Sequence, residues 1–280
     1  MMLIADSGST KTNWCLVDNT TTSFHTEGYN PYFVSSAYIS NSLQTNLPSS
    51  VQREAVTDIH FYGAGCASGK DEIIHDALQA VFPHAQIHIA MDLLAAARAL
   101  LGTQPGFAAI LGTGANTCLY DGHHITKNID SLGFVMGDEG SGAAIGKQLL
   151  SDYMRGYMPE TISQLFWDTF QLDATQLMHN IYALPLANRY CAGFCRFISD
   201  HLESEYLHRL VKNCFNDFFK NLVTRYPGYR ENTFNSVGSI AFHFQHILAA
   251  VSSEYDMRMG KIILSPMHDL VEYHLLREKA

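Results

Sequence analysis

Two short segments of the sequence repeat one pattern, and this repeat constrains the fold more than any other feature. Residues 1–18 and 107–121 each consist of an apolar strand, a polar turn rich in Gly, Ser and Thr, and a second strand. A shift of 103 positions aligns residues of the first segment with identical residues of the second: Thr10 with Thr113, Asn13 with Asn116, Cys15 with Cys118, Leu16 with Leu119, and Asp18 with Asp121. We therefore predict two related halves, each offering one turn to a shared cleft.

The first turn has the composition of a phosphate-binding loop. Gly8 has no Cβ, so backbone N–H groups can approach a ligand closely, and the hydroxyl residues on either side can donate to phosphate oxygens. Asp6 ends the first strand and points into the same mouth, where a carboxylate could hold a hydrated metal ion. An ordinary polar hairpin is the alternative interpretation of this stretch.

Composition and charge exclude several classes of protein. The chain has 280 residues, 47% hydrophobic and 16% charged, which suits two globular domains and is unlike a disordered protein. A net charge of −9 argues against broad nucleic-acid binding. The six cysteines lack metal-ligand spacing. No apolar run approaches the ~20 residues that span a bilayer, and the apolar start is too short for a signal peptide. We expect a cytoplasmic protein with no membrane or nucleic-acid partner.

The order of predicted elements divides the chain near a short linker at residues 103–106. We expect an N-terminal α/β domain over 1–104 and a C-terminal domain over 105–266 with a helical insertion. The terminal helix, 267–280, is expected to pack back on the first domain.

Two further residues of the first half have the chemistry of a site. Asn30 precedes Pro31, which favours an extended backbone and leaves an amide that suits a sugar hydroxyl, although Asn-Pro is also a common turn start. Asp92 follows a predicted strand and begins a predicted helix. It is therefore either a helix N-cap or a general base at the carboxyl end of a strand, and the two roles are compatible.

The second half has two glycine-rich segments that suggest close contact with a ligand. Asp138 lies in the first, residues 133–142, where it could complement a helix dipole or face a ligand. Gly238 and Ser239 end a predicted strand before a predicted helix over 242–252, and a backbone without a Cβ could lie flat against an adenine or ribose. His243 and His246 are three apart on that helix, but two ligands make a weak metal site.

Four motifs, taken in order, resemble the N-acetylglucosamine kinase branch of the BadF/BadG/BcrA/BcrD ATPase family, in the actin/hexokinase/Hsp70 superfamily. They span nearly the whole chain: residues 6–12, 112–116, 136–141 and 237–241. The resemblance implies two ribonuclease-H-like (actin-like ATPase) domains around a nucleotide cleft, with ATP and Mg²⁺ as cofactors. It also implies phosphorylation of a small-molecule amino sugar, most simply N-acetylglucosamine to its 6-phosphate.

The resemblance assigns a role to each candidate residue. It places Mg²⁺ near Asp6 and makes Asp92 the general base. Sugar-contacting positions correspond to Asn30, Asn116 and Asp138. The nucleotide would be held by the two phosphate loops and the adenosine motif, namely Gly8, Ser9, Thr10, Lys11, Gly112, Thr113, Gly114, Gly238 and Ser239.

Two other functions remain open from the sequence. A dehydratase-activating ATPase of the same family would need paired thiolates for an iron–sulfur cluster, and Cys66 in a glycine-rich loop is the one candidate. A non-catalytic sugar or nucleotide sensor would keep the fold without the acids at 6, 92 and 138. The particular hexosamine, the hydroxyl that is phosphorylated and the oligomeric state, including a homodimer, are also left open.

Overall fold

The computed structural model describes residues 1–8, 10–18, 20–66 and 69–278 of the chain. Two compact units divide it. Unit 1 comprises residues 1–104, 122–124 and 265–280, and unit 2 comprises residues 105–121 and 125–264. In the part of the chain that is described, no helix is both long and apolar enough to cross a bilayer.

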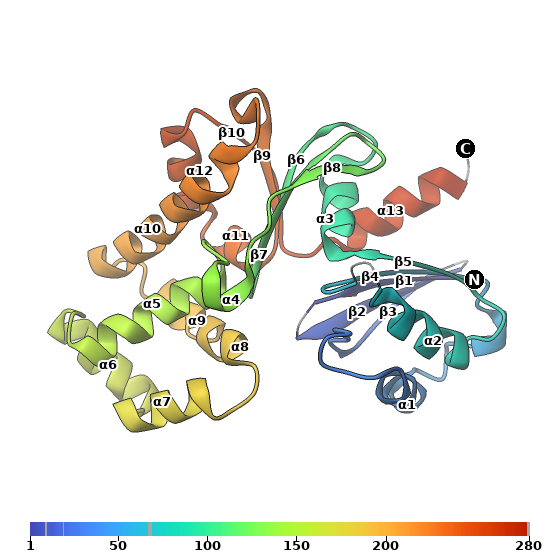
Figure 1. The fold of residues 1–280 in the computed structure, drawn as a ribbon, viewed down its shortest axis with the longest axis horizontal. Coiled ribbons are helices and arrows are strands. Elements are labelled where there is room, and N and C mark those ends of the chain that lie inside the picture. The colour runs from blue at the N-terminus through green and yellow to red at the C-terminus, as the bar shows by residue number, and fades with distance from the viewer. Residues whose placement is uncertain (9, 19, 67–68, 279–280) are drawn as a thin grey trace. The chain divides into compact units, whose positions relative to one another are not determined.

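Unit 1 is built on a five-stranded mixed sheet with the order β3-β2-β1-β4-β5 (Figure 1). Its strands are β1 (Met2–Ser7), β2 (Lys11–Val17), β3 (Thr21–Glu27), β4 (Asp58–Gly63) and β5 (Gln86–Met91). The first three strands pair antiparallel, whereas β1, β4 and β5 run parallel. The carboxyl ends of β1 and β5 therefore lie at the same edge of the sheet, which is where open α/β sheets bind ligands.

Helices cover both faces of this sheet because β1 is apolar on both sides. Leu3 and Ala5 join the core with α1 (Ser36–Asn46) and α2 (Asp71–Val81). Met2 and Ile4 face the opposite way and join a core with α3 (Asp92–Leu101) and α13 (Met267–Glu278), which pack against each other (Figure 1). A short 3₁₀ turn, η1 (Arg53–Ala55), precedes β4. The end of the chain thus completes the first unit.

Unit 2 repeats this sheet with the order β10-β9-β6-β7-β8. Its strands are β6 (Gly106–Leu111), β7 (Ala115–Tyr120), β8 (Ile125–Asn128), β9 (Thr233–Val237) and β10 (Arg258–Ile263). As in unit 1, the first three strands pair antiparallel and the first, fourth and fifth run parallel. The shared topology confirms the α/β fold with two related domains that the repeat predicts.

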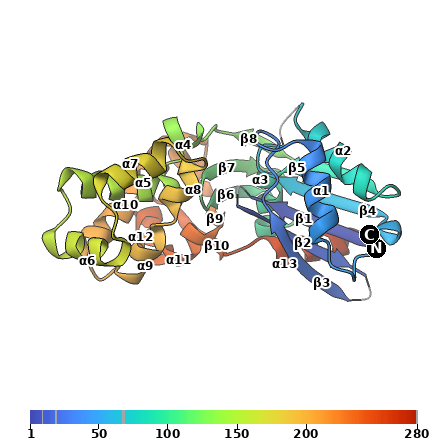
Figure 2. The same ribbon diagram turned by 90° about the horizontal axis from the view of Figure 1, so that it is seen from below.

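The helices between β8 and β9 make unit 2 the larger of the two (Figure 2, green to orange). They pack with the sheet and the helices after β9 around one core rich in phenylalanine, which includes Phe166, Phe215 and Phe234. The bounds of the helices and 3₁₀ turns are α4 (Gly133–Met136), α5 (Gly142–Arg155), α6 (Glu160–Phe170), α7 (Ala174–Tyr182), α8 (Ala187–Ala192), α9 (Cys195–Asp200), α10 (Glu205–Asn221), η2 (Val223–Arg225), η3 (Tyr229–Glu231), α11 (Ser239–His243) and α12 (Gln245–Glu254).

Two local predictions are wrong. The helix expected over 242–252 is two helices that meet at Phe244, whose buried side chain packs in the core, so His243 and His246 belong to different helices. Asp92 is the first residue of α3 and not its N-cap, which is Met91. The Asp92 carboxylate nevertheless accepts a hydrogen bond from the Leu93 backbone N–H at 2.9 Å.

Candidate functional site

The β1–β2 hairpin of unit 1 is closed by backbone contacts that leave its turn at the surface. The Gly8 N–H donates to the Lys11 carbonyl at 3.0 Å, and Thr10 and Lys11 are exposed. Beneath the turn, the buried hydroxyls of Ser7 and Thr12 lie 2.7 Å apart and anchor it to the sheet. Gly8, Thr10 and Lys11 therefore remain candidates for phosphate contacts, and Ser9 lies outside the described residues.

The carboxylates of Asp6 and Asp92 lie close enough to interact, one near the end of β1 and the other just after β5. Burial and, to a lesser extent, the negative charge of Asp92 raise the pKa of Asp6 to about 7, against the opposing effects of a hydrogen bond from Asn13 and the charge of Lys11. Burial also raises the pKa of Asp92 to about 6. Two carboxylates in one poorly solvated place repel each other, which is typical of sites that receive a cation or a proton.

This pair fits the Mg²⁺ that the resemblance implies. Mg²⁺ prefers carboxylate and water oxygens and keeps much of its hydration shell, so a single carboxylate is a sufficient protein ligand. A cation beside Asp6 would relieve the repulsion that now raises the pKa of its carboxyl group. Asp92 would then remain available to accept a proton.

Asn30 lies in a tight loop after β3, and part of its side chain is used by that loop. Its side-chain oxygen accepts a hydrogen bond from the Tyr32 N–H at 3.0 Å. The same oxygen lies against Gly65, where a Cβ would come within 2.7 Å of it. The NH₂ group is the part of the amide that this turn does not use, so a contact with a sugar would involve donation from that group.

The β6–β7 hairpin of unit 2 carries Gly112, Thr113 and Gly114, and the start of α5 supports it. The Gly142 and Ala143 N–H groups donate to the carbonyls of Gly112 and Thr113 at 2.8 and 3.0 Å. These contacts satisfy N–H groups that a helix start leaves without a helical partner. They also fix the turn from behind. The Gly112 N–H is used within the turn, where it donates to the Gly114 carbonyl at 3.0 Å, so a ligand would contact the other N–H groups of the turn or the Thr113 hydroxyl.

Asp138 is a buried residue that holds the same hairpin. Its carboxylate accepts a hydrogen bond from the Ala115 N–H at 3.1 Å, and a Cβ on Gly114 would lie 3.3 Å from it. Burial raises the pKa of this carboxyl group. Asn116, on β7, accepts hydrogen bonds from the Thr117 N–H and from Asn128. Both sugar-contact predictions stay predictions, and Asp138 has in addition a structural role that its sequence position did not reveal.

A cavity of about 500 Å³ in unit 2 brings two predicted motifs together. Gly112 and Thr113 line it beside Ser239, at the start of α11. Gly238 does not line the cavity, but it allows the backbone before α11 to approach the end of β6. Its φ is +129°, and a Cβ there would lie 2.3 Å from the Leu111 carbonyl oxygen. The volume is in the range of cavities that bind small ligands and cofactors.

Basic side chains of this cavity were not predicted as part of the site. Arg189, Arg196 and His243 line it, and Arg196 is paired with Asp200 at 3.8 Å; of the three, only His243 was singled out from the sequence, as a weak metal ligand. Guanidinium groups bind phosphate oxygens well, which makes these residues candidate nucleotide contacts. They lie on α8, α9 and α11, so only a prediction of how those helices pack against the hairpin would have found them.

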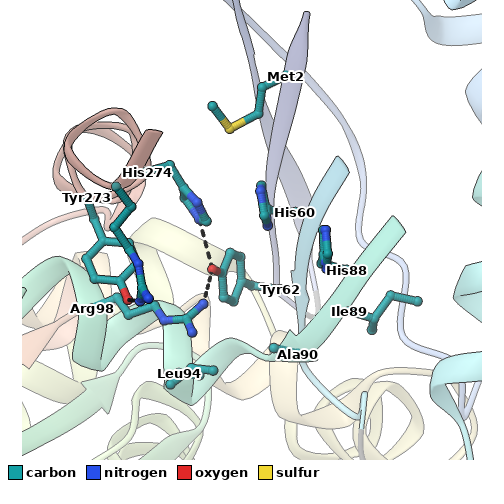
Figure 3. A pocket seen from close by; sticks show the side chains of 11 residues that line it. Met2, His60, Tyr62, His88, Ile89, Ala90, Leu94, Arg98, Tyr273 and His274 are labelled. Carbon is teal, nitrogen blue, oxygen red and sulfur yellow. Dashed lines mark hydrogen bonds between the residues drawn. The ribbon is translucent and has the colours of Figure 1, made fainter. Parts of the chain in front are cut away.

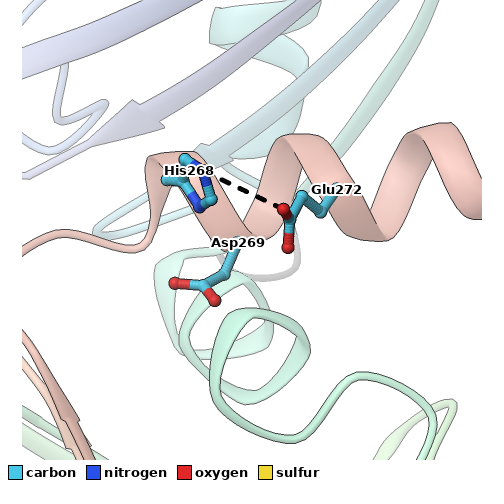
Figure 4. Close-up of side chains that lie close together, drawn as sticks. All are labelled: His268, Asp269 and Glu272. Carbon is cyan, nitrogen blue, oxygen red and sulfur yellow. Dashed lines mark ion pairs between the residues drawn. The ribbon is translucent and has the colours of Figure 1, made fainter.

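Two other groups of residues have the chemistry of a metal or cluster centre. Cys66, the candidate for an iron–sulfur cluster, is buried, and burial raises the pKa of its thiol to about 12, which opposes a thiolate. His268, Asp269 and Glu272 lie close together on the first turns of α13 (Figure 4). His268 and Glu272 form an i,i+4 pair at 3.9 Å, which is common on a solvated helix surface. We assign neither group to a site.

Within each unit, the predicted residues thus fall into distinct groups. Asp6 and Asp92 interact in unit 1, and Asn30 lies against the loop after β4. In unit 2, Gly112, Thr113 and Ser239 share a cavity, whereas Asp138 holds the hairpin from the buried side.

Comparisons with known proteins identify relatives of this arrangement. A crystal structure from Porphyromonas gingivalis, described as a "putative N-acetylglucosamine kinase", matches with a TM-score of 0.95 and 37% identity, covering 99% of this chain and 100% of that one. A protein of the same description from Chromobacterium violaceum matches with a TM-score of 0.73 and 17% identity, covering 97% and 98%. MreB 5 of Spiroplasma citri, bound to AMPPNP, matches with a TM-score of 0.62 and 11% identity, covering 99% and 96%. No family model and no curated protein matches the sequence.

The last two comparisons show a shared fold. The first is close in sequence as well and extends over both chains from end to end. The chain therefore belongs to the N-acetylglucosamine kinase-like family, with the two-domain fold of the actin/hexokinase/Hsp70 superfamily.

Proposed function

We propose that the protein is a kinase that transfers the γ-phosphate of ATP to a hydroxyl of a small-molecule amino sugar, most simply N-acetylglucosamine, which becomes its 6-phosphate. The observation that carries the proposal is the cavity of unit 2, where the phosphate loop at Gly112 and Thr113 meets the adenosine motif at Ser239. The family relationship supports it, since the relative with 37% identity is described as a "putative N-acetylglucosamine kinase".

The proposal gives each group of residues one task. The turn at Gly8–Lys11 and the hairpin at Gly112–Gly114 bind phosphate oxygens with backbone N–H groups and hydroxyls. The unit 2 cavity holds the nucleoside, with Arg189 and Arg196 beside it. Mg²⁺, held through Asp6, neutralises phosphate charge when it is bound.

Asp92 is proposed as the general base. The acceptor hydroxyl loses its proton as the new bond to phosphorus forms, and a carboxylate nearby can take it. A pKa raised to about 6 keeps Asp92 ionised for the most part at neutral pH while making it a better base than an ordinary aspartate. Asn30, Asn116 and Asp138 are proposed to orient the sugar, Asn30 through its amide NH₂ group.

A coupled ADP-release assay with Mg-ATP tests this proposal. The panel contains glucose, glucosamine, N-acetylglucosamine and N-acetylmannosamine, with a reaction lacking sugar as the control. We expect turnover that depends on sugar and is fastest with N-acetylglucosamine, and a product identified by NMR as the 6-phosphate. ATP hydrolysis that no sugar accelerates, or the absence of turnover with every sugar, would refute the kinase proposal.

A further inference from the structure

Unit 1 contains a second cavity, and neither Asp6 nor Asp92 lines it. Its volume is about 490 Å³, and it lies between the sheet and the two helices α3 and α13. Met2, Ala90 and Leu94 belong to the apolar core on this face of the sheet and give the cavity an apolar floor, whereas the polar lining residues are basic or aromatic. A mostly apolar hollow of this size with a few convergent polar groups has the features of a small-molecule site.

The polar side chains of this cavity come from four separate elements and form one connected group. The Tyr62 hydroxyl, from β4, accepts a hydrogen bond from Arg98 of α3 at 2.5 Å and lies 2.9 Å from Nε2 of His274 of α13 (Figure 3). The His60 ring stacks on His274 with ring centres 4.0 Å apart and on His88 of β5 at 4.8 Å. These elements are distant in the sequence, and the contacts between them hold the three imidazole rings and the guanidinium group close together.

The charge of the lining has one sign. Arg98 and Arg277 both line the cavity, together with three imidazoles, and among the described residues that line it none is acidic. The two arginines lie over the face of Tyr273, at 5.1 and 5.6 Å from its ring centre. Asp58, at the start of β4, is an acidic residue that favours the protonated form of His60. Guanidinium groups and histidines in such a setting are typical of binding sites for phosphate or carboxylate groups.

His60 and His274 are held neutral by this environment. Burial, as the largest cause, together with the positive charge of Arg98 and the neighbouring imidazoles, lowers the pKa of His60 to about 4 and that of His274 to about 3. A bound anion would oppose both effects, because it supplies the negative charge that an imidazolium needs. Anion binding and proton uptake are therefore coupled at this place.

We propose that the cavity between β4, β5, α3 and α13 is a binding site for a small organic anion, whose phosphate or carboxylate group contacts Arg98, Arg277 and the stacked histidines. The apolar floor would receive the body of the molecule. This site is separate from the proposed nucleotide and sugar contacts and does not depend on kinase activity.

Titration calorimetry on the full chain tests the proposal, with sulfate as the probe for a phosphate group and succinate as the probe for a carboxylate. The nucleotide site is saturated with Mg-AMPPNP, and ionic strength is held constant with NaCl. We expect binding of at least one probe, and Arg277→Gln, at an exposed position, should weaken it about tenfold. Arg53→Gln, an exposed arginine of unit 1 outside the cavity, is the matched control and should leave binding unchanged.

Two further measurements locate the site and its coupling to protons. We expect sulfate to bind more strongly at pH 6 than at pH 8. Sulfate itself does not titrate in this range, so the difference would come from proton uptake by groups of the protein. In histidine-labelled protein, the probe should shift the NMR resonances of His60, His88 and His274. Equal binding by Arg277→Gln and the wild type, no binding of either probe, or shifts confined to histidines outside the cavity would overturn the proposal.

Discussion

The two units share one sheet topology but differ in the chemistry at corresponding positions. In unit 1, Asp6 pairs in register with Asn13, whereas in unit 2 the corresponding Asn116 is opposite the apolar Ile110. The last parallel strand of unit 1 is followed by Asp92, and that of unit 2 by Leu264. Unit 1 has kept both acids at the strand ends, and unit 2 has neither.

Unit 2 has a different specialisation. Its hairpin is supported by the start of α5 and by Asp138, and a cavity beside the hairpin is lined by Arg189 and Arg196. Two sheets of one topology thus carry different side chains at corresponding positions, and on the proposed function they serve two different tasks. We expect unit 1 to provide the metal site and the base, and unit 2 to provide most of the nucleotide contacts. The predictions that follow test this division.

The largest effect is expected for Asp92→Asn. Loss of a general base typically lowers turnover about 10²–10⁴-fold. Because the change removes a partly buried charge without changing the size of the side chain, nucleotide affinity and thermal stability should stay close to those of the wild type. The kcat for N-acetylglucosamine and the Kd for AMPPNP measure the two effects, and near-normal kcat would remove Asp92 from this role.

Asp6→Ala should raise the Mg²⁺ concentration needed for half-maximal activity by roughly tenfold or more, as expected when a charged partner of a hydrated ion is lost. A Mg²⁺ titration of the initial rate measures this change. Asp18→Ala alters an exposed carboxylate after the neighbouring strand and is the control. If both variants needed the same Mg²⁺ concentration, Asp6 would have no part in holding the metal.

The glycines of the two units should respond differently to a methyl group. In Gly238→Ala the new Cβ would meet the Leu111 carbonyl in a left-handed backbone, so we expect a loss of roughly 1–3 kcal/mol in the free energy of unfolding. In Gly8→Ala the new Cβ would lie 3.8 Å from the Lys11 carbonyl oxygen, an ordinary van der Waals contact, so the fold should tolerate it. A weaker AMPPNP affinity of a stable Gly8→Ala protein would support close approach of phosphate to that backbone. Unchanged affinity would argue against it.

Arg196→Gln should raise the KM for ATP about 10- to 100-fold and leave the KM for the sugar unchanged, since a guanidinium contact with phosphate is worth roughly 1.5–3 kcal/mol. Arg209→Gln is a matched control, because Arg209 is also exposed and also forms an i,i+4 ion pair, with Glu205. Steady-state kinetics of both variants would distinguish a nucleotide contact from a general effect of charge. Equal KM values for ATP would exclude Arg196 from the nucleotide site.

The smallest expected effect is the change in the stability of unit 1 with pH. The pKa values of His60 and His274 are lowered from 6.5 to about 4 and about 3, so below pH 6.5 the unfolded chain binds more protons than the folded chain. The contribution of these two histidines to the stability of unit 1 should therefore fall as the pH is lowered from 6.5 towards 4, whereas the raised pKa values of Asp6 and Asp92 give contributions of the opposite sign. Chemical denaturation of the wild type and of His60→Gln at several pH values isolates the histidine contribution, because the slope of stability against pH should be less positive in the variant than in the wild type. An unchanged slope in that variant would contradict the assignment.

Local patterns predicted much of the fold and part of the site. The strand, turn and strand pattern needs only neighbouring residues, so the two hairpins and the acids at the strand ends were visible in the sequence. The break at Phe244 was not, because the core contact of that side chain overrides the helical pattern. Arg189, Arg196 and the stack of His60, His88 and His274 depend on packing between distant elements, which no local spacing encodes.

A crystal structure of the complete chain with Mg-AMPPNP and N-acetylglucosamine tests the division of tasks most directly. We predict a single nucleotide with its adenosine in the cavity beside Ser239, its terminal phosphates on both Gly8–Lys11 and Gly112–Gly114, and the acceptor hydroxyl next to Asp92. A nucleotide that contacts the loop of only one unit, or a sugar bound away from Asp92, would contradict the account.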